Sequence, residues 1–431
     1  MFQARDFRYA LRRFSREPLF TAVALLTLGL GIGATTAVYS VVDGVLLEPL
    51  PYDRPDELVS VFHSAPGLDV HRIPNSRSSH AVYETESRSF RTMALHSGTA
   101  LTLTEGGEPV RLIGRRVTPA LFQVLRVQPA LGRAFTEEEG RPGAAPVVLL
   151  SHGLWVERFG ADPDILERTV SLSDQAYEVV GVMPEGFDFP SESVRLWVPM
   201  AIDPAGTSFQ GFNEEGIARL LPGVRPEDAQ QEIQGLIPRL LERYPDLPPS
   251  LLERMELQAR VEPYIHDVVG EIRTALWVLL GTVIFVLFIA CANVANLMLV
   301  RAEGRRREMA LRSAIGAGRR ELLIQHLSES LVLAGVGAVL GLGLAWQGLA
   351  LLRRLGADSV PRLDQVGLDG SVLLVVSALT TLAAVVFALI PVLRHRSLQP
   401  GEELREGSRW TTPGSRGIRA RELLVAGQVA L

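Results

Sequence analysis

Four long apolar runs divide the chain into alternating apolar and polar parts. They cover residues 18–42, 274–300, 330–352 and 370–393, and none of them contains Asp, Glu, Lys or Arg. Each run reaches the roughly 20 residues that a helix needs to cross the hydrocarbon core of a bilayer. Arginines flank all four, which favours membrane spans over buried helices of a large soluble protein. We therefore expect an α-helical transmembrane bundle whose spans lie at residues 18–42, 271–300, 327–352 and 371–393.

Residues 43–270, between the first two spans, have a different pattern. Short apolar segments alternate there with Gly- and Pro-containing turns, as in a compact α+β domain. Alternation and β-branched residues predict strands at residues 58–63, 110–117, 146–151 and 257–261, and a hairpin at residues 169–183. Helical spacing predicts helices at residues 81–90, 152–159 and 227–244. The expected fold is thus a membrane bundle with a large α+β domain inserted between spans one and two.

The remaining segments are short. Residues 1–17 have apolar positions at helical spacing with arginines between them, which predicts an amphipathic helix at the membrane surface. Residues 353–370 form a loop between spans three and four, and residues 394–421 read as a polar linker. Residues 422–431 are mostly apolar and read as the beginning of a fifth span, but so few apolar residues cannot cross a bilayer. We therefore expect the chain to be a fragment or a truncated gene product.

The distribution of charge orients the spans. Residues 1–17, 301–329 and 394–422 together hold 19 arginines and 10 acidic residues, whereas residues 43–270 hold 20 arginines and 34 acidic residues. The positive-inside rule places the first three segments in the cytoplasm and residues 43–270 on the outside of the membrane. The first apolar run is too long for a signal peptide and no small-residue cleavage site follows it, so we expect an uncleaved anchor.

Composition argues against catalysis. All 43 basic residues are arginine, so the chain has no Walker A loop, which requires a lysine. No H-E-x-x-H or G-x-S-x-G motif occurs. His63, Asp69, His71 and His80 match no standard metal spacing and are expected in a solvated loop. Cys291 is the single cysteine, which excludes an intrachain disulfide. We expect no enzyme activity, no metal, no cofactor and no nucleic-acid partner.

Two glycine pairs stand out in the spans. Gly29 and Gly33 in the first span, and Gly337 and Gly341 in the third, each form a G-x-x-x-G pair, which permits close approach of another helix. The run LGLGIGATT lacks the third glycine of a dinucleotide-binding loop and has no strand before it. Helix packing is therefore the preferred interpretation of these glycines.

Three polar residues lie within or near the spans. Asn293 and Asn296 are three positions apart near the cytoplasmic end of the second span, where such residues bond to a neighbouring helix or line a translocation pathway. Glu329 lies at the inner end of the third span, from which it can reach the interface. Spacing alone leaves both roles of the asparagines open.

Residues 301–326 form the most basic loop. They include RAEGRRREMALRSAIGAGRR, in which Leu311, Ala314, Ile315 and Gly318 form a narrow apolar stripe on a short helix. Such a helix either lies on anionic lipid or docks into a groove on a partner protein. The pattern by itself does not choose between them.

Several segments in order resemble one known family, the MacB/FtsX-type ABC transporter permeases. The matching segments are EPLFTAVALLTLGLGIGATTAVYSVVDGVLLEPLPY, VTPALFQVLRVQPALGRAF, VVLLSHGLWVERFG, YEVVGVMPEGFDFP and CANVANLMLVRAEGRRREMALRSAIGAGRRELLIQHLSES. The chain resembles in particular the duplicated orphan permease branch common in acidobacteria, of which it would be the N-terminal half. In that branch a second copy follows the linker, and residues 422–431 would be the start of this second repeat, truncated here. The resemblance implies a MacB-like periplasmic core domain with an inserted β-rich part, expected at about residues 117–199.

The resemblance also implies a partner. In such permeases the cytoplasmic loop contacts an ABC ATPase, and the matching positions here are Arg307, Glu308, Arg312, Gly316 and Ala317. The chain would transmit ATP-driven motion of that ATPase to the periplasmic domain for export or efflux, with ATP bound by the partner. A complete permease would need a homodimer or a second permease half. Some relatives instead act as membrane sensors that recruit periplasmic enzymes, and this is the alternative function.

Overall fold

The chain folds into two compact units. The computed structural model describes Phe14 and residues 17–304, 319–356, 362–363 and 366–395, apart from residues 106–107, 167, 204–205, 207–208, 210, 247 and 271. One unit combines Met1–Glu48 with Glu271–Leu431, and the other is Pro49–Gly270. The predicted amphipathic helix (except Phe14 and Glu17), residues 305–318 of the basic loop, the linker beyond His395 and residues 422–431 lie outside the described residues.

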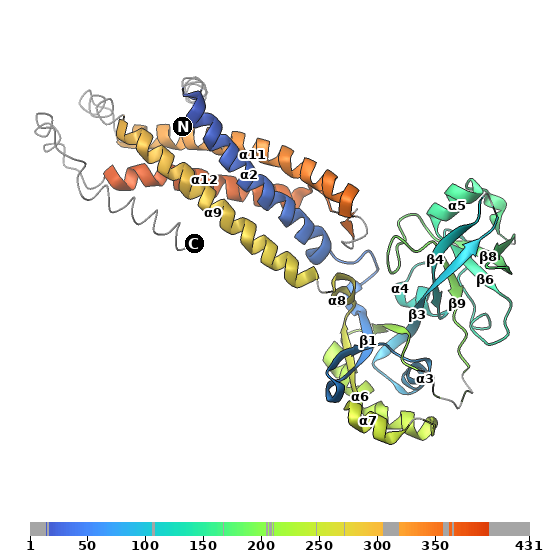
Figure 1. Cartoon of the computed structure of the whole chain (residues 1–431). Coiled ribbons are helices and arrows are strands. Elements are labelled where there is room, and N and C mark those ends of the chain that lie inside the picture. Colours follow the sequence, from blue (N-terminus) through green and yellow to red (C-terminus); the bar gives the residue numbers. More distant parts are fainter. Residues whose placement is uncertain are drawn as a thin grey trace, which may run out of the picture. The chain divides into compact units, whose positions relative to one another are not determined.

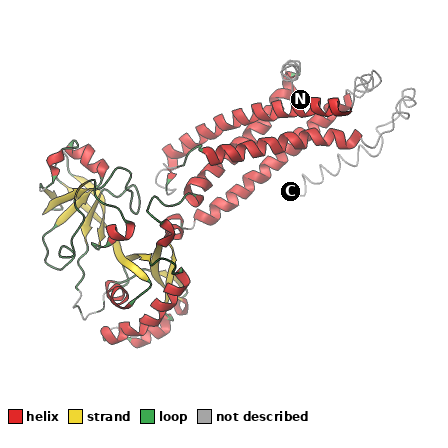
Figure 2. Ribbon diagram, turned by 180° about the vertical axis from the view of Figure 1, so that it is seen from behind, coloured by secondary structure: helices red, strands yellow, loops and turns green. Residues whose placement is uncertain are grey.

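The first unit is a bundle of long helices. Its described helices are α2 (Pro18–Val42), which continues into a π-helical turn at Asp43–Leu47, α9 (Ile272–Gly304), α11 (Arg319–Gly356) and α12 (Gly370–His395). Figures 1 and 2 show these helices running alongside one another. Among the described residues, three candidate membrane spans are found, at Pro18–Leu47, Ile272–Met298 and Leu327–Arg354. The apolar part of α12, Gly370–Val385, is shorter, so the number of four spans stays a prediction.

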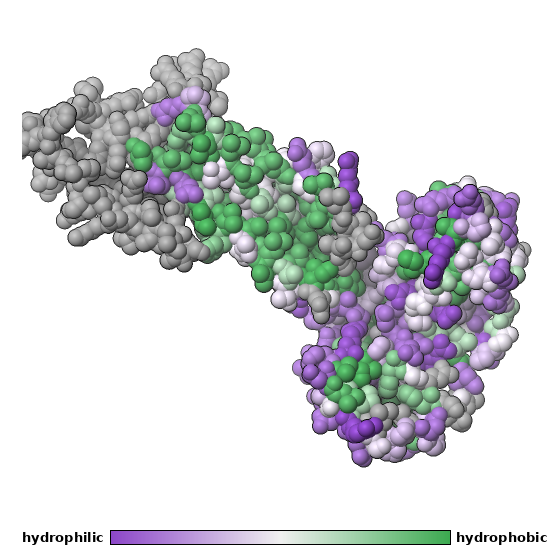
Figure 3. All heavy atoms as spheres, viewed as in Figure 1, coloured by the Kyte–Doolittle hydropathy of each residue, from purple (hydrophilic) through white to green (hydrophobic). Residues whose placement is uncertain are grey.

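The surface of this bundle is apolar. Side chains such as Leu26, Val278, Val339 and Leu374 are between 62% and 70% exposed. Figure 3 shows hydrophobic residues gathered over the described helices. Exposed apolar side chains on this scale would be unfavourable in water and suit contact with lipid chains.

The second unit is built on one 11-stranded sheet. The strand order is β11-β1-β10-β3-β4-β9-β6-β8-β5, with β2 paired to β1 and β7 paired to β3 and β8. The strands are β1 (Leu58–Ala65), β2 (Val70–Ile73), β3 (Phe90–Leu103), β4 (Val110–Val117), β5 (Leu131–Gly132), β6 (Val147–Leu150), β7 (Thr169–Leu172), β8 (Gln175–Val182), β9 (Leu196–Pro199), β10 (Glu215–Leu220) and β11 (Gln258–Pro263). The helices are α3 (Arg77–Glu86), α4 (Leu121–Leu125), α5 (His152–Phe159), α6 (Pro226–Arg243), α7 (Pro249–Met255) and α8 (Tyr264–Val269).

The long strand β3 joins the two ends of this sheet. Its first half pairs with β10, and its second half pairs with β4 and touches β7. One core, around Val61, Ile233 and Val261, lies between α6 and the β11–β1–β10 end. A second core, around Leu154 and Val179, lies at the β6–β8 end. β4 also contributes Leu112 to this second core. The insertion expected at about residues 117–199 stays a prediction.

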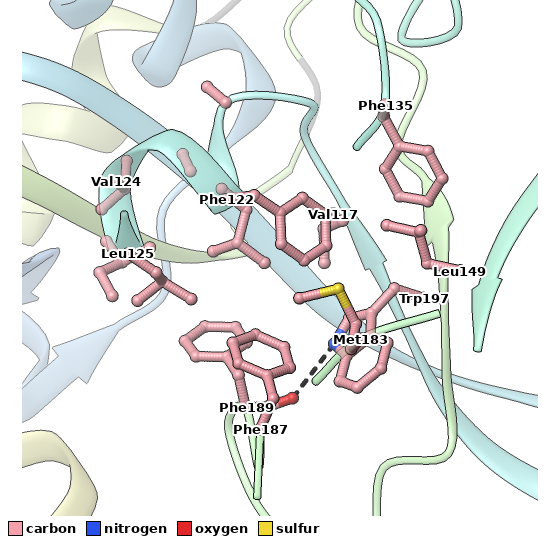
Figure 4. Packing of buried hydrophobic residues seen from close by; sticks show 14 of the residues in the cluster. Val117, Phe122, Val124, Leu125, Phe135, Leu149, Met183, Phe187, Phe189 and Trp197 are labelled. Atoms are coloured by element: carbon pink, nitrogen blue, oxygen red, sulfur yellow. Dashed lines mark hydrogen bonds between the residues drawn. The ribbon is translucent and has the colours of Figure 1, made fainter. Parts of the chain in front are cut away.

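A third, aromatic core lies between these two. Trp197 is fully buried there among Phe122, Phe187 and Phe189, and its indole Nε1 donates to the carbonyl oxygen of Phe189 at 3.2 Å. Figure 4 shows side chains of α4 facing this tryptophan. Burying the polar indole N–H is tolerated because this hydrogen bond replaces the one that the N–H group would make to water. This core draws on both ends of the sheet and therefore links them.

Several elements differ from the sequence prediction. The helix expected at residues 81–90 runs from Arg77 to Glu86, because Ser76 caps it by accepting from the backbone N–H of Ser79 at 2.9 Å. Phe90 already belongs to β3, a strand that the sequence analysis missed, as it missed β9 and β10. The strands at β1, β4, β6 and β11, the β7–β8 hairpin and helices α5 and α6 form where they were expected.

Candidate functional site in the helix bundle

The centre of the bundle is a close contact between α2 and α11. A Cβ added at Gly33 would lie 2.9 Å from the carbonyl oxygen of Gly341, and a Cβ added at Gly341 would lie 3.0 Å from the backbone nitrogen of Gly33. Gly29 and Gly337 face the same contact, with the Cβ of Leu340 and of Leu28 against them at 3.4 and 3.0 Å. The structure thus brings all four glycines of the two G-x-x-x-G pairs together. Without side chains in between, the two backbones approach closely enough for extensive van der Waals contact.

The opposite side of α2 packs against α9. Gly31 lies two positions from Gly29 and Gly33, about 200° around the helix, and a Cβ there would meet Leu287 at 3.1 Å and Ala290 at 3.3 Å. Thr35, one turn further along, donates from its hydroxyl to Gly31 at 2.8 Å, and its hydroxyl also lies 3.4 Å from the carbonyl oxygen of Val283. The sequence analysis did not single out these two residues. The alternation of glycines in LGLGIGATT was the available signal, because it creates two opposite small faces.

The outer end of α2 is fixed to the segment before α12. Gly44 lies in the π-helical turn, and a Cβ there would be 3.1 Å from Val366. The hydroxyl group of Ser371 donates to the carboxylates of Asp43 and Asp369, and the guanidinium of Arg362 donates to the carbonyl oxygen of Glu48 at 2.9 Å. These contacts hold the end of α2 and the start of α12 together.

The predicted polar residues of the spans have different surroundings. Asn293 is exposed on the bundle and Asn296 is half-buried, so neither is enclosed by the helices. Glu329 is 5% exposed and lies beside the buried Ser328 and Ser330. The position of Glu329 relative to the membrane interface stays a prediction. The roles of the two asparagines stay predictions.

The predicted ATPase contact lies outside the described residues. Arg307, Glu308, Arg312, Gly316 and Ala317 all fall within residues 305–318, between α9 and α11. What the structure describes is the pair of helices that this loop joins, and both of them pack on α2 through the contacts above.

Two of the histidines expected in a solvated loop are buried in the second unit, Pro49–Gly270, which we call the outer unit or outer domain. His63 lies on β1 and His80 on α3, and their exposed fractions are 0% and 2%. The ring Nε2 of His63 forms a hydrogen bond of 2.8 Å with the hydroxyl group of Tyr83. Asp69 and His71 are exposed, so the four residues do not converge. Among the described residues no group of His, Cys, Asp and Glu side chains is arranged to hold a metal ion.

Comparison with known proteins identifies both parts of the chain. The family model of the MacB-like periplasmic core domain matches residues 21–236, and that of the FtsX-like permease C-terminal region matches residues 280–400. The chain belongs to the MacB/FtsX-type ABC transporter permease family. It is a membrane permease of that family with a periplasmic α/β domain, as the resemblance implied.

Individual relatives match the chain at low identity. The chain is 28% identical over 294 residues to the macrolide export ATP-binding/permease protein MacB of Bdellovibrio bacteriovorus, covering 67% of this chain and 43% of that protein. It is 28% identical over 295 residues to the uncharacterized ABC transporter permease YvrN of Bacillus subtilis, covering 66% of this chain and 68% of that one. The periplasmic region of MacB from Actinobacillus actinomycetemcomitans aligns over 50% of this chain and 93% of its own, at 15% identity and a TM-score of 0.36. The chain thus spans less than half of the MacB relative that it matches.

Proposed function

We propose that the chain is a permease subunit that transmits ATP-driven motion of a separate ABC ATPase to its periplasmic domain, for export or efflux. The observation that carries the proposal is the pairing of a MacB-like outer domain with an FtsX-like helix bundle in one chain. The bundle supports it mechanically, since α9 and α11, which flank the cytoplasmic loop, both pack tightly on α2. Motion imposed on that loop would then reach α2, which leads directly into the outer domain.

Charge supports the orientation that this function requires. The excess of arginine in residues 1–17, 301–329 and 394–422 favours a cytoplasmic N-terminus and an ATPase contact at residues 301–326. No Walker A lysine exists in these 431 residues, so ATP would be bound by the partner. We further propose that the working permease is a homodimer or a pair with a second permease half in the inner membrane. Assignment to the duplicated orphan branch depends on residues 419–431 and stays a prediction.

The test is co-purification of the full chain with the ATPases of its own organism. We expect an ABC ATPase to be recovered, and its recovery to be lost in Glu308→Arg or Arg312→Glu, because both reverse a charge in the cytoplasmic loop. Arg91→Glu is the matched control, since Arg91 is an exposed arginine of the outer domain. Equal recovery of ATPase in all variants would contradict the proposed contact. Recovery of a periplasmic hydrolase and no ATPase would support the regulatory alternative.

A further inference from the structure

A groove of about 390 Å³ lies between helix α6 and the edge strand β11 of the outer domain. It is lined by four glutamines and one alanine: Gln230, Gln231, Gln234, Gln258 and Ala259. Its volume falls within the range of about 300–1,000 Å³ that is common for ligand sites. Such sites are mostly lined by apolar and aromatic side chains, whereas this lining consists almost entirely of carboxamide groups and carries no charge. We therefore expect an uncharged ligand that is rich in hydrogen-bonding groups.

Two of the glutamines are held in place by the strand edge. The apolar stripe of α6 is buried against the sheet, and Gln230 and Gln234 lie beside this stripe, at the edge of β11. The Oε1 atom of Gln230 accepts from the backbone N–H of Val261 at 3.3 Å, and that of Gln234 accepts from the N–H of Ala259 at 2.7 Å. The Nε2 group of Gln234 also donates to the carbonyl oxygen of Leu257 at 3.4 Å. Their acceptor atoms are thus used by the domain itself.

The amide donors of the groove are largely unused. The Nε2 groups of Gln230, Gln231 and Gln258 have no acceptor among the described residues. The Oε1 atom of Gln258 accepts from the guanidinium of Arg260 at 3.0 Å, which leaves only its amide donors for a ligand. Because each Nε2 group carries two N–H donors, the groove presents more donors than acceptors. A ligand must therefore supply oxygen acceptors, such as the carbonyl groups of a peptide main chain.

The spacing of the glutamines matches an extended peptide. Residues i and i+4 of a helix are about 6 Å apart along its axis, at 1.5 Å per residue. Every second residue of a strand is separated by about 6.6–6.8 Å. Gln230 and Gln234 already show this match, because they bond to N–H groups two residues apart on β11. Since a carboxamide has both an acceptor and two donors, it can bond to β11 and donate to a second extended chain at the same time.

We propose that the groove between α6 and β11 binds an extended, uncharged peptide segment, whose main-chain carbonyl groups accept from the glutamine Nε2 groups. Main-chain hydrogen bonds supply affinity in recognition of this kind, without requiring particular side chains. The groove belongs to the periplasmic domain, so the segment would come from a protein in the periplasm. This inference goes beyond the proposed function and does not depend on the contact with an ATPase.

The experiment measures binding of a neutral, fluorescently labelled peptide, acetyl-Ser-Val-Ser-Val-Ser-Val-amide, to the full chain in lipid nanodiscs by fluorescence anisotropy. We expect saturable binding that Gln230→Glu weakens about fivefold, which corresponds to the loss of one hydrogen bond of about 1 kcal/mol. Glutamate keeps an oxygen that accepts from the N–H of Val261, so the strand edge stays covered. It lacks the Nε2 donors, however, and its charge repels a carbonyl oxygen.

Two further variants complete the test. Gln231→Ala should weaken binding to a similar degree without affecting the fold, because Gln231 is exposed and bonds to no described residue. Gln175→Glu places the same new charge at an exposed position of β8, outside the groove, and should leave binding unchanged. Absence of saturable peptide binding would overturn the inference, as would equal weakening by Gln175→Glu. Tighter binding of a soluble N-acetylglucosamine oligomer than of the peptide would also overturn it, and would assign the groove to a sugar.

Discussion

Gly341 shows how a single residue sets the distance between two helices. Its Cβ position is occupied by the backbone of α2, with the nitrogen of Gly33 at 3.0 Å and the oxygen of Gly29 at 3.1 Å. We predict that Gly341→Val forces α2 and α11 apart and lowers the stability of the bundle by about 1–3 kcal/mol, the usual cost of overpacking. Differential scanning fluorimetry of the full chain in detergent would detect this as a lower melting temperature.

Gly343 supplies the matched control on the same helix. Nothing lies within 4 Å of a Cβ added there, so Gly343→Val introduces the same side chain and the same loss of helix propensity without a clash. If Gly341→Val and Gly343→Val have the same melting temperature, the close contact between α2 and α11 does not stabilise the protein.

Three buried histidines make the outer domain sensitive to acid. Burial lowers the pKa of His63 and of His80 from 6.5 to about 4. Burial, assisted by the charge of Arg115, lowers the pKa of His96 to about 3. Each histidine is therefore neutral in the folded domain, while the unfolded chain takes up its proton near pH 6.5. The free energy of unfolding therefore has its full value above about pH 6.5. It decreases as the pH falls towards 4, by up to about 1.4 kcal/mol per pH unit for each histidine.

Denaturant unfolding of residues 49–270 between pH 7.5 and 5, followed by tryptophan fluorescence, would measure this slope. His80→Gln keeps a polar side chain at a position that faces Glu84. It should reduce the slope of the free energy of unfolding against pH by the amount that corresponds to about one fewer proton taken up on unfolding. A free energy of unfolding that does not change from pH 7 to pH 5 would show that these histidines are not kept neutral by burial.

At the scale of elements, α6 protects the edge of the sheet. The edge strand β11 has outward backbone N–H groups at Ala259 and Val261, and these donate to the side chains of Gln234 at 2.7 Å and Gln230 at 3.3 Å. The two glutamines are four residues apart on α6, so they reach successive outward positions of the strand. An edge strand without such partners is a template for pairing with another chain.

We predict that Gln230→Ala combined with Gln234→Ala causes self-association of the full chain in detergent. It should also cost about 1 kcal/mol for each lost hydrogen bond. Light scattering coupled to size-exclusion chromatography would show species larger than those of the parent protein. Gln231→Ala is the control, since Gln231 is exposed on the same helix. An unchanged mass in the double variant would mean that the edge is protected by other means.

Many elements of this fold could be predicted from the sequence because their signals are local. Unbroken apolar runs indicated the helices of the bundle, and alternating residues indicated β1 and the β7–β8 hairpin. The strand β3 was missed because its exposed half, with Gly98 and Thr99, has no regular alternation and is stabilised by pairing with β4, a tertiary interaction. The start of α3 was misplaced because Ser76 was not recognised as a cap.

The candidate site could likewise be predicted only in part. Spacing of four residues identified Gly29 with Gly33 and Gly337 with Gly341, but it could not indicate that the two pairs meet each other. The ion pair between Glu57 and Arg219 could not be predicted at all, since the two residues are 162 positions apart in sequence. His63 and His80 were misjudged because polar neighbours suggested a loop, whereas β1 and α3 bury both rings.

At the scale of the whole molecule, the chain combines a helix bundle with an outer domain through two connections. The first follows α2 and leads into β1, and the second runs from β11 through α8 to α9, so the two connections join neighbouring strands of the sheet. Membership of the MacB/FtsX-type permease family agrees with this organisation, since one family model covers residues 21–236, from α2 into α6, and the other covers residues 280–400 of the bundle. We therefore predict that an event at the cytoplasmic loop is detected in the outer domain.

The most direct test of this claim measures the outer domain while the nucleotide state is changed on the other side of the membrane. Spin labels at Asp56→Cys and Val156→Cys in a Cys291→Ser background of the full chain, reconstituted with its co-purified ATPase, would be compared without nucleotide and with ATP and vanadate. We predict a change in the distance distribution on adding ATP and vanadate, and no change when Glu308→Arg is present. Distributions that are the same in both nucleotide states, with the ATPase demonstrably bound, would contradict the proposal that this permease transmits ATP-driven motion to its periplasmic domain.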